Sequence, residues 1–117
     1  MDMPLLRLTT GVLQDPVDTE GITSKLSGIV SDVLGKPEEY VMTVLSEESV
    51  SMSGKAGPAA LVEIYSIGGL GPHVNGTLAS RVTEFLSGEL PLSPDRIYVI
   101  FSDVPGEDWA RAGRTFR

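Results

Sequence analysis

The sequence contains no cysteine and a single histidine, His73. Without cysteine, the chain can form no disulfide, has no thiol nucleophile and lacks the thiolate ligands of the common zinc sites. One histidine is too few for a histidine-rich metal site within one chain. We therefore expect neither a metal nor a cofactor, and most metalloenzyme and hydrolase chemistry is excluded.

Basic residues are also scarce. Nine Lys and Arg stand against sixteen Asp and Glu, which gives a net charge of −7. A surface of this sign repels the phosphates of a nucleic acid unless basic residues gather in one place. The one visible cluster, Arg111, Arg114 and Arg117, follows the acidic residues Glu107 and Asp108. We interpret it as a solvated tail, with contact to an anion as the alternative, and expect no nucleic-acid partner.

Long hydrophobic runs are absent as well. No apolar run approaches the ~20 residues that a membrane-spanning helix needs. The N-terminal residues MDMPLLRLTT have no basic segment and only a two-residue apolar run, which does not fit a signal peptide. We therefore expect no membrane partner and a cytoplasmic protein, with secretion by a non-classical route left open.

What the chain does contain is a regular pattern that occurs twice. In each half, a strand is followed by a helix, a proline-led turn and a second strand. Apolar residues spaced as on one face of a helix predict helices at about 21–34 and 75–90. The first has Asp18 and Thr19 as candidate N-caps and Gly35 as its closing residue. The expected strands are 5–10, 40–45, 60–67 and 97–101.

This repetition predicts the fold class and the domain organisation. A chain of 117 residues that is 41% hydrophobic suits one domain over residues 1–117, with pseudo-repeats at about 4–46 and 60–103. A duplicated β-α-β unit of the ferredoxin-like kind is an α+β fold. Right-handed crossovers then place both helices on one face of a four-stranded sheet.

The other face of that sheet predicts association between copies of the chain. In the strands at 40–45 and 97–101, the residues that point to either face of the sheet are mostly apolar, as in strands that are buried on both sides. Two helices can cover only one side, and apolar surface left in water costs ~25 cal/mol per Å². We therefore predict an obligate homo-oligomer in which the sheets of several copies pack together.

The linker and the glycine-rich segment do not match a phosphate-binding motif. Residues 47–58 are expected to form a loop with a short hairpin. Gly68-Gly69-Leu70-Gly71 lies between a strand and a helix, but Val74 stands where the dinucleotide fingerprint has its third glycine. We interpret this segment as a plain turn and His73 as a surface loop residue.

Several blocks of sequence, in one order along the chain, are specific in combination. They are Met3-Pro4-Leu5-Leu6, Gly35-Lys36-Pro37-Glu38-Glu39-Tyr40-Val41-Met42, Ser66-Ile67-Gly68-Gly69, Ser93-Pro94-Asp95-Arg96-Ile97-Tyr98, and Trp109 with Thr115-Phe116. In these blocks, from Met3 to Phe116, the chain resembles the macrophage migration inhibitory factor family of the tautomerase superfamily. The resemblance implies a homotrimer whose sheets line a central barrel, and keto–enol tautomerase activity toward aromatic 2-oxo acids and dopachrome-like compounds.

The resemblance also implies which groups react. Pro4 matches the family's catalytic base, an N-terminal proline that is exposed when the initiator methionine is removed. A free proline nitrogen is a secondary amine, and its pKa can fall toward neutrality in an apolar pocket close to a cation. Lys36 matches that cation, which would also hold the substrate carboxylate. Ile67 matches the residue whose backbone amide binds the substrate, with Ser66 beside it.

Further residues match the walls of the family's pocket. Tyr98 matches an aromatic wall that the neighbouring subunit contributes in the family, and Tyr40, Trp109 and Phe116 match residues at the rim. For these three residues, ordinary packing is the alternative. Ile100 stands where a polar asparagine is common in the family, so a hydrogen bond to the substrate ring is lost and specificity for hydroxylated aromatic compounds is in question.

The residues before Pro4 leave two functions open. If translation starts at Met1, the Pro4 nitrogen lies in an amide bond and has no basicity, whereas a start at Met3 allows trimming that exposes it. The first function is a phenylpyruvate or dopachrome-type tautomerase with Pro4 as the base. The alternative is a catalytically weak or inactive cytokine-like binding protein, which engages a protein receptor and in which Met1-Asp2-Met3 blocks Pro4.

Two further functions differ from both in their chemistry. A ligand-sensing ferredoxin-like trimer unrelated to tautomerases would hold Pro4 far from Lys36. Decarboxylation or hydration of small acids would want extra arginines near Pro4. Arg7 is the only nearby arginine in sequence, and strand alternation places it on the same face as Leu5.

Overall fold

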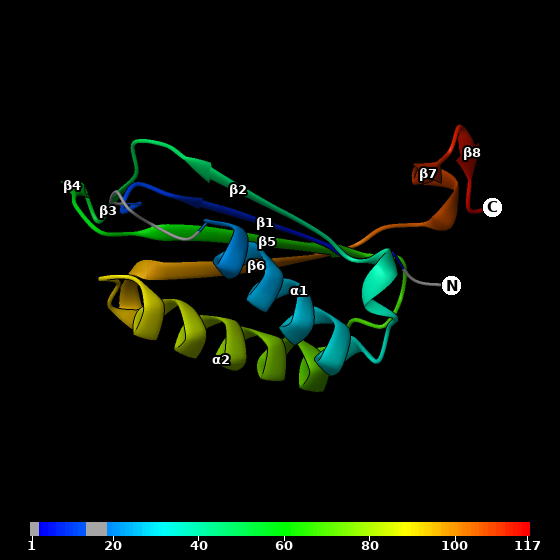
Figure 1. Ribbon diagram of the computed structural model, residues 1–117, viewed down its shortest axis with the longest axis horizontal. Helices are drawn as coiled ribbons and strands as arrows, with labels where there is room; N and C mark the ends of the chain where they lie inside the picture. Colours follow the sequence, from blue (N-terminus) through cyan, green and yellow to red (C-terminus); the bar gives the residue numbers. More distant parts are fainter. Residues whose placement is uncertain (1–2, 14–18) are drawn as a thin grey trace.

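The computed structural model describes residues 3–13 and 19–117 (Figure 1). Two long helices lie against a four-stranded sheet, and short hairpins and single-turn 3-10 helices connect them. The elements in chain order are β1 (Leu5–Thr10), α1 (Thr19–Leu34), η1 (Glu38–Tyr40), β2 (Met42–Glu47), β3 (Ser51–Met52), β4 (Lys55–Ala56), β5 (Ala60–Ser66), α2 (Pro72–Glu89), η2 (Pro94–Arg96), β6 (Ile97–Asp103), η3 (Gly106–Asp108), β7 (Ala110–Arg111) and β8 (Arg114–Thr115).

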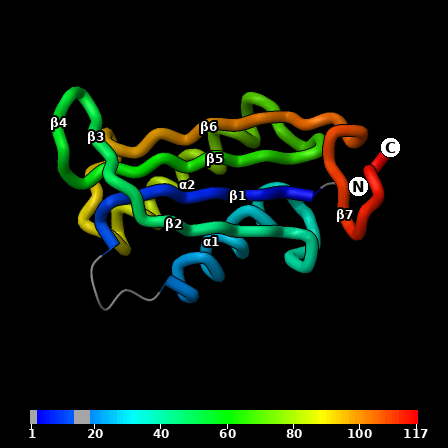
Figure 2. The backbone as a smooth tube through the Cα atoms, turned by 90° about the horizontal axis from the view of Figure 1, so that it is seen from above, coloured from blue at the N-terminus to red at the C-terminus, as the bar shows by residue number. Residues whose placement is uncertain are grey.

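The sheet has the order β2-β1-β5-β6. β1 pairs with β2 in parallel and β5 pairs with β6 in parallel, while β1 and β5 meet as an antiparallel pair at the centre. Both helices lie on the same face of the sheet, as Figures 1 and 2 show from two directions. The predicted duplicated β-α-β fold is confirmed, with one parallel pair and one helix from each half of the chain.

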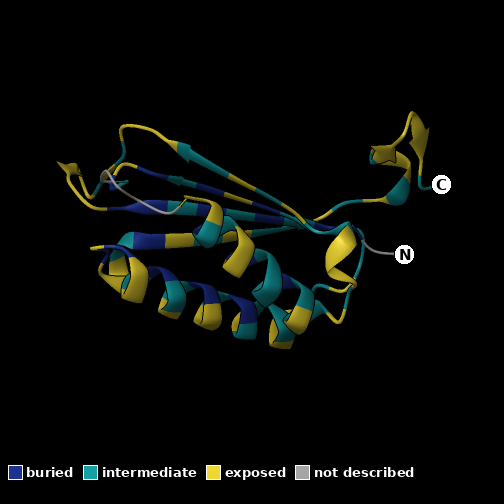
Figure 3. Cartoon of the chain, in the orientation of Figure 1, coloured by how far each residue is buried: buried dark blue, intermediate teal, exposed yellow. Residues whose placement is uncertain are grey.

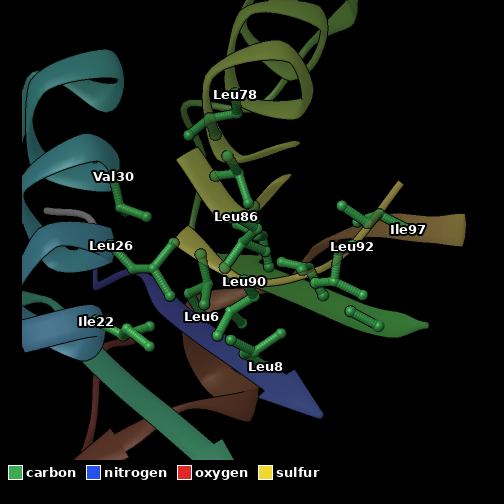
Figure 4. Close-up of a cluster of buried hydrophobic side chains, with 14 of the residues drawn as sticks. Leu6, Leu8, Ile22, Leu26, Val30, Leu78, Leu86, Leu90, Leu92 and Ile97 are labelled. Atoms are coloured by element: carbon green, nitrogen blue, oxygen red, sulfur yellow. The ribbon is translucent and has the colours of Figure 1, made fainter. Parts of the chain in front are cut away.

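The core lies between the helices and the sheet (Figure 4). Each helix buries one stripe, and the strands contribute every second residue, because a strand points alternate side chains to opposite faces. In Figure 3 the dark-blue buried segments accordingly concentrate where the helices and the sheet meet. The fully buried aliphatic residues that carry the core are Leu6, Leu8, Leu26, Val30, Val62, Leu78, Val82 and Leu86.

The ends of α1 agree closely with the sequence pattern. The helix begins at Thr19, two residues before the expected start at 21, and Asp18 lies outside the described residues. Gly35 closes it with a φ of 67°, in the left-handed region that glycine enters without steric cost. The Lys36 N–H then donates to the carbonyl of Ser31 at 3.1 Å, and the Ser31 hydroxyl donates to the carbonyl of Lys36 at 2.5 Å.

The start of α2 differs from the expectation. The helix begins at Pro72 rather than at 75, because proline suits the first turn, where its missing N–H would have no partner in the helix. The Gly71 N–H donates to the side-chain oxygen of Asn75 at 3.2 Å, and the Asn75 N–H donates back to the Gly71 carbonyl at 2.8 Å. His73 therefore lies exposed in the first turn of α2, and its interpretation as a loop residue was wrong.

The strand expected at 40–45 also begins later. Pro37 opens a 3-10 turn in which the Tyr40 N–H donates to the Pro37 carbonyl at 3.0 Å. This turn places Tyr40 in η1 rather than in the strand, and β2 starts at Met42. The strand expected at 60–67 ends one residue early, so that Ile67 follows β5 directly.

Two hairpins complete the fold. The β3–β4 hairpin lies in the predicted 47–58 loop and turns at Ser53 and Gly54, which both have positive φ. The second hairpin, β7–β8, was not predicted, because its residues were interpreted as a solvated tail. It turns at Ala112 and Gly113, again with both φ values positive, as in the two-residue turns that match the twist of a hairpin.

The sheet face away from the helices carries apolar side chains on both edge strands. Met42 on β2 and Tyr98 on β6 are each 62% exposed, and Val44 and Ile100 on the same strands are also exposed. This observation agrees with the pattern that predicted association, although the structure describes a single chain. No helix in the described part of the chain has the length and apolar character needed to span a membrane.

Candidate active site

A pocket of about 510 Å³ opens at the end of the sheet where β1 begins. Three separate segments build it: the start of β1, the η1–β2 junction and the C-terminal hairpin. The structure thus brings together Pro4, Tyr40, Trp109 and Phe116, four of the residues singled out in the sequence. The complete lining is Met3, Pro4, Leu5, Glu39, Tyr40, Val41, Met42, Trp109, Ala110, Arg111 and Phe116.

The sheet holds Pro4 in the lining of this pocket. Its side chain is fully buried, and its carbonyl accepts a hydrogen bond from the Met42 N–H at 3.1 Å. That bond extends the parallel pairing of β1 and β2 by one residue beyond Leu5 and Met42. Proline fits this position because the first residue of a strand need not donate to the ladder.

Trp109 and Phe116 reach the pocket because the C-terminal hairpin is folded back on itself. The Phe116 N–H donates to the carbonyls of Gly106 and Trp109, each at 3.0 Å, and the Trp109 N–H donates to Gly106 at 3.3 Å. These bonds close the seven-residue interval between the two aromatic residues. The ribbon in Figure 1 shows β7 and β8 standing beyond the end of the sheet, on the side where the chain begins.

Arg111 is a pocket residue that the sequence analysis interpreted as part of a solvated tail, with contact to an anion as the alternative. Its guanidinium carbon lies over the ring of Tyr40, 5.6 Å from the ring centroid. Arg7, the arginine nearest to Pro4 in sequence, instead points to the uncovered sheet face and pairs with Glu63. One signal was available: Arg111 follows Trp109 by two residues, and side chains two residues apart along extended backbone point to the same side.

Lys36, Ser66 and Ile67 are not part of the pocket lining in the single chain. Lys36 is half-buried at the end of α1, four residues before Tyr40. Ser66 is fully buried, and its hydroxyl donates to the Gly68 carbonyl at 2.7 Å. Ile67 follows Ser66 at the same end of the sheet as Pro4, because Tyr65 pairs with Leu5.

Tyr98 and Ile100 lie away from Pro4. Tyr98 pairs with Leu61 of β5, and Leu61 pairs with Thr9 of β1, so Tyr98 sits at the level of Thr9. Thr9 is five residues beyond Pro4, a distance of roughly 16 Å along an extended strand, and β6 is two strands away from β1. One chain alone therefore does not place the Tyr98 ring in the pocket of Pro4.

The clearest electrostatic perturbation lies on the uncovered sheet face. The Tyr65 hydroxyl donates to Glu63 at 2.8 Å and the Arg7 Nε donates to the other carboxylate oxygen at 2.9 Å, and both bonds lower the pKa of Glu63. The hydrogen bond to Glu63 raises the pKa of Tyr65. Across residues 3–13 and 19–117, no three His, Asp or Glu side chains gather in a way that could hold a metal ion.

Comparison with known proteins agrees with the fold. The family model for macrophage migration inhibitory factor (MIF) matches residues 3–117. Over 115 residues the chain is 32% identical to the macrophage migration inhibitory factor homolog of Brugia malayi. The aligned region covers 97% of this chain and 99% of the relative. The macrophage migration inhibitory factor of Meriones unguiculatus gives the same identity and coverage.

Two solved structures have nearly the same fold. The macrophage migration inhibitory factor homologue from Prochlorococcus marinus superposes with a TM-score of 0.91 at 33% identity, covering 97% of this chain and 99% of that one. The macrophage migration inhibitory factor of Toxoplasma gondii gives a TM-score of 0.90 at 27% identity, covering 96% and 99%. With sequence, fold and family model in agreement over nearly its whole length, the chain belongs to the macrophage migration inhibitory factor family of the tautomerase superfamily.

Proposed function

We propose that this protein is a keto–enol tautomerase that acts on aromatic 2-oxo acids of the phenylpyruvate or dopachrome type. The observation that carries the proposal is the position of Pro4, a buried residue in the lining of a pocket that Tyr40, Trp109 and Phe116 also line. Aromatic walls of this kind suit a flat aromatic substrate, and family membership supports the same chemistry.

The proposed reaction moves one proton and leaves the oxidation state unchanged. The free Pro4 nitrogen takes a proton from the carbon next to the carbonyl group, and the electron pair of that C–H bond forms the carbon–carbon double bond. The carbonyl oxygen gains a proton, which gives the enol, and ketonisation reverses these steps. The apolar lining from Leu5, Val41 and Met42 favours an uncharged amine, because burial disfavours the charged form.

In this proposal Lys36 holds the substrate carboxylate and lowers the proline pKa, while the backbone amide of Ile67 donates to the substrate. Both roles come from the family resemblance, and both residues lie outside the pocket lining of the single chain. Lys36 lies two residues before η1, which carries Tyr40 into the pocket, and this position supports the proposed role of Lys36. Ser66 would act by positioning the segment around Ile67 through its bond to Gly68.

We further propose that the active form is a homotrimer and that Tyr98 and Ile100 enter the pocket from a neighbouring copy. Both side chains are exposed on the outer face of β6, and β6 and β2 form the two edges of the sheet. Exposed apolar side chains on open sheet edges are typical of surfaces that pair with another chain. In the pocket of the neighbouring copy, Ile100 would then contribute an apolar side chain in place of a hydrogen-bonding group.

Met3 decides whether the base exists. It is only 4% exposed, lines the pocket and is joined to Pro4 by the peptide bond that would deprive the nitrogen of basicity. Removal of Met3 would create the secondary amine and at the same time clear part of the pocket. If Met3 stays in place, the same observation favours the second candidate function, a cytokine-like binding protein that keeps the scaffold without catalysis.

The test compares a chain that begins at Pro4 with one that keeps Met1-Asp2-Met3. We expect enol-phenylpyruvate to be ketonised by the first chain and not by the second, and Pro4→Gly in the shorter chain to abolish turnover. Intact-mass spectrometry of the protein from its natural source then tells which form occurs. Equal turnover by the two chains, or by the Pro4→Gly variant, would show that the proline nitrogen is not the base.

A further inference from the structure

We propose that Arg111 is an anion-binding residue of the Pro4 pocket and that it makes the site prefer ligands with a second carboxylate over monocarboxylates. The inference deepens the proposed function and rests on it for the identity of the substrate. It stands on three observations: where Arg111 lies, which charges line the pocket, and which interactions its side chain makes.

Arg111 belongs to the pocket although it is far from Pro4 in sequence. It lies on β7, and the bonds from Phe116 to Gly106 and Trp109 fold that hairpin back on itself at the pocket. The guanidinium lies over the ring of Tyr40, which comes from η1. The contact therefore joins two of the three segments that build the pocket, and it places a positive charge at their junction.

Among residues 3–13 and 19–117, only two charged side chains line the pocket, Glu39 and Arg111. Glu39 repels an anionic ligand, and the chain as a whole carries a net charge of −7. Attraction of an acid into this pocket must come from a local cation, because the field of the whole protein has the wrong sign. Arg111 is the cation in the lining, while Lys36 lies at the end of α1, outside it.

The donors of Arg111 remain available to a ligand. Within residues 3–13 and 19–117, its side chain has no hydrogen bond or ion pair to protein, and its contact with Tyr40 is to the ring. A guanidinium held over an aromatic ring keeps its N–H groups for a carboxylate, which it can bind with two parallel hydrogen bonds. An aromatic acid whose first carboxylate goes to Lys36 would offer a second one to Arg111.

Arg114 provides a matched control in the same hairpin. It pairs directly with Arg111 across β7 and β8 and carries the same charge, but it does not line the pocket. Arg114→Gln and Arg111→Gln therefore change the net charge equally. Only the second removes a cation from the pocket.

The experiment measures binding of two inert probes, phenylacetate and its 4-carboxy derivative, to the chain that begins at Pro4. Trp109 is the only tryptophan and lines the pocket, so its fluorescence reports occupancy without turnover. We expect the dicarboxylate to bind about tenfold more tightly than the monocarboxylate, as one charge-assisted bidentate contact would give. Arg111→Gln should abolish this preference, Arg111→Lys should keep part of it, and Arg114→Gln should leave it intact.

Several results would overturn the inference: no preference in the unsubstituted chain, an unchanged preference in Arg111→Gln, or an equal loss for both probes. Melting temperatures of all variants check that each is folded. Turnover of enol-phenylpyruvate, measured on the same samples, separates this inference from the proposed function. A preserved dicarboxylate preference without turnover would remove the tautomerase and leave the Arg111 site, whereas turnover without the preference would do the reverse.

Discussion

Arg7 and Glu63 lie directly opposite each other on β1 and β5, and their side chains form an ion pair in the middle of the uncovered sheet face, with Arg7 Nη2 2.7 Å from Glu63 Oε1. Exposed apolar residues lie on either side of this pair, because Val44 on β2 pairs with Arg7 and Ile100 on β6 pairs with Glu63. Burying an ion pair costs several kcal/mol unless its hydrogen bonds are complete. Association through the apolar edges should therefore leave the centre of this face in contact with water.

The low pKa of Glu63 predicts an acid-sensitive stability. Its folded pKa lies below the ordinary value of 4.5, mainly because Tyr65 donates to it and then because of Arg7. As pH falls, the unfolded chain takes up this proton before the folded chain does. The contribution of Glu63 to stability is therefore complete above about pH 4.5 and is lost as pH falls through the folded pKa. Urea unfolding between pH 2 and 7 should show this slope, and Glu63→Gln should reduce it.

Tyr65→Phe refines the same prediction. It removes the hydrogen bond that contributes most to the low pKa of Glu63, so the folded pKa should move closer to the ordinary value, and the loss of stability in acid should be smaller and end at a higher pH than in the unsubstituted chain. An acid slope that is the same in Glu63→Gln and in the unsubstituted chain would mean that this carboxylate does not govern it.

Thr10 provides a test of the buried polar groups near the end of β1. Its hydroxyl is fully buried, donates to the Ala59 carbonyl at 2.8 Å and accepts from the Val12 N–H at 3.4 Å. Thr10→Val keeps the shape but leaves both partners without the hydroxyl, and should lower the free energy of unfolding by about 1–3 kcal/mol. Thr9→Val, one residue away on the opposite face, should change it by less than ~0.5 kcal/mol in a denaturant titration. Similar losses in the two variants would argue against the buried bonds as the cause.

Arg96 should hold the β3–β4 hairpin in place. Its guanidinium donates to three backbone carbonyls, those of Pro58 at 2.6 Å, Lys55 at 3.1 Å and Met52 at 3.3 Å. Arg96→Ala should lower amide exchange protection in the hairpin and cost about 1–2 kcal/mol of stability. Arg96→Lys should not restore protection, since an ammonium lacks the planar fork of donors.

Arg81→Ala is the control for this effect. It removes an exposed arginine that pairs with Asp32, a type of pair that contributes at most ~1 kcal/mol. Hairpin protection in this variant should match the unsubstituted chain. If Arg96→Ala also leaves the hairpin protected, its bonds to the three carbonyls are not what orders it.

Mixed assemblies test the shared pocket. Pro4→Gly and Tyr98→Ala, each prepared with the chain starting at residue 4, should have little activity alone. After the two are unfolded together and refolded, some sites should combine an intact Pro4 with an intact Tyr98 from a neighbour, and turnover of enol-phenylpyruvate should exceed the average of the separate samples. Native mass spectrometry should show trimers that contain both subunits. Activity equal to the average in such mixed trimers would place Tyr98 outside the site.

The regular parts of the fold could be predicted because their causes are local. The stripe of Ile22, Leu26 and Val30 marks a helix with one buried face, and Gly35 ends it through a backbone conformation that needs no distant partner. The errors also have local explanations. Pro72 extended α2 by entering its first turn, and Pro37 converted the start of an expected strand into a 3-10 turn.

The candidate site was predictable only in part. Pro4, Tyr40, Trp109 and Phe116 were identified by the order of their sequence blocks, and the structure brings them into one pocket. The place of Arg111 in the pocket was not predicted, because it depends on a hairpin whose turn at Ala112 and Gly113 carries little sequence signal. Tyr98 could be chosen from sequence, but its distance from Pro4 follows from the strand register.

By itself, the sequence determined the two helices, the strands they connect, the family and the residues that carry its motifs, because hydrophobic period and turn residues act over a few positions. Only the tertiary structure decided which side chains share the pocket and that Arg111 is the cation among them. It also decided that Arg7 and Glu63 form an ion pair in the middle of the uncovered sheet face. Those relationships depend on strand register and on hairpins that bring distant residues together, and such long-range contacts leave no periodic trace along the chain.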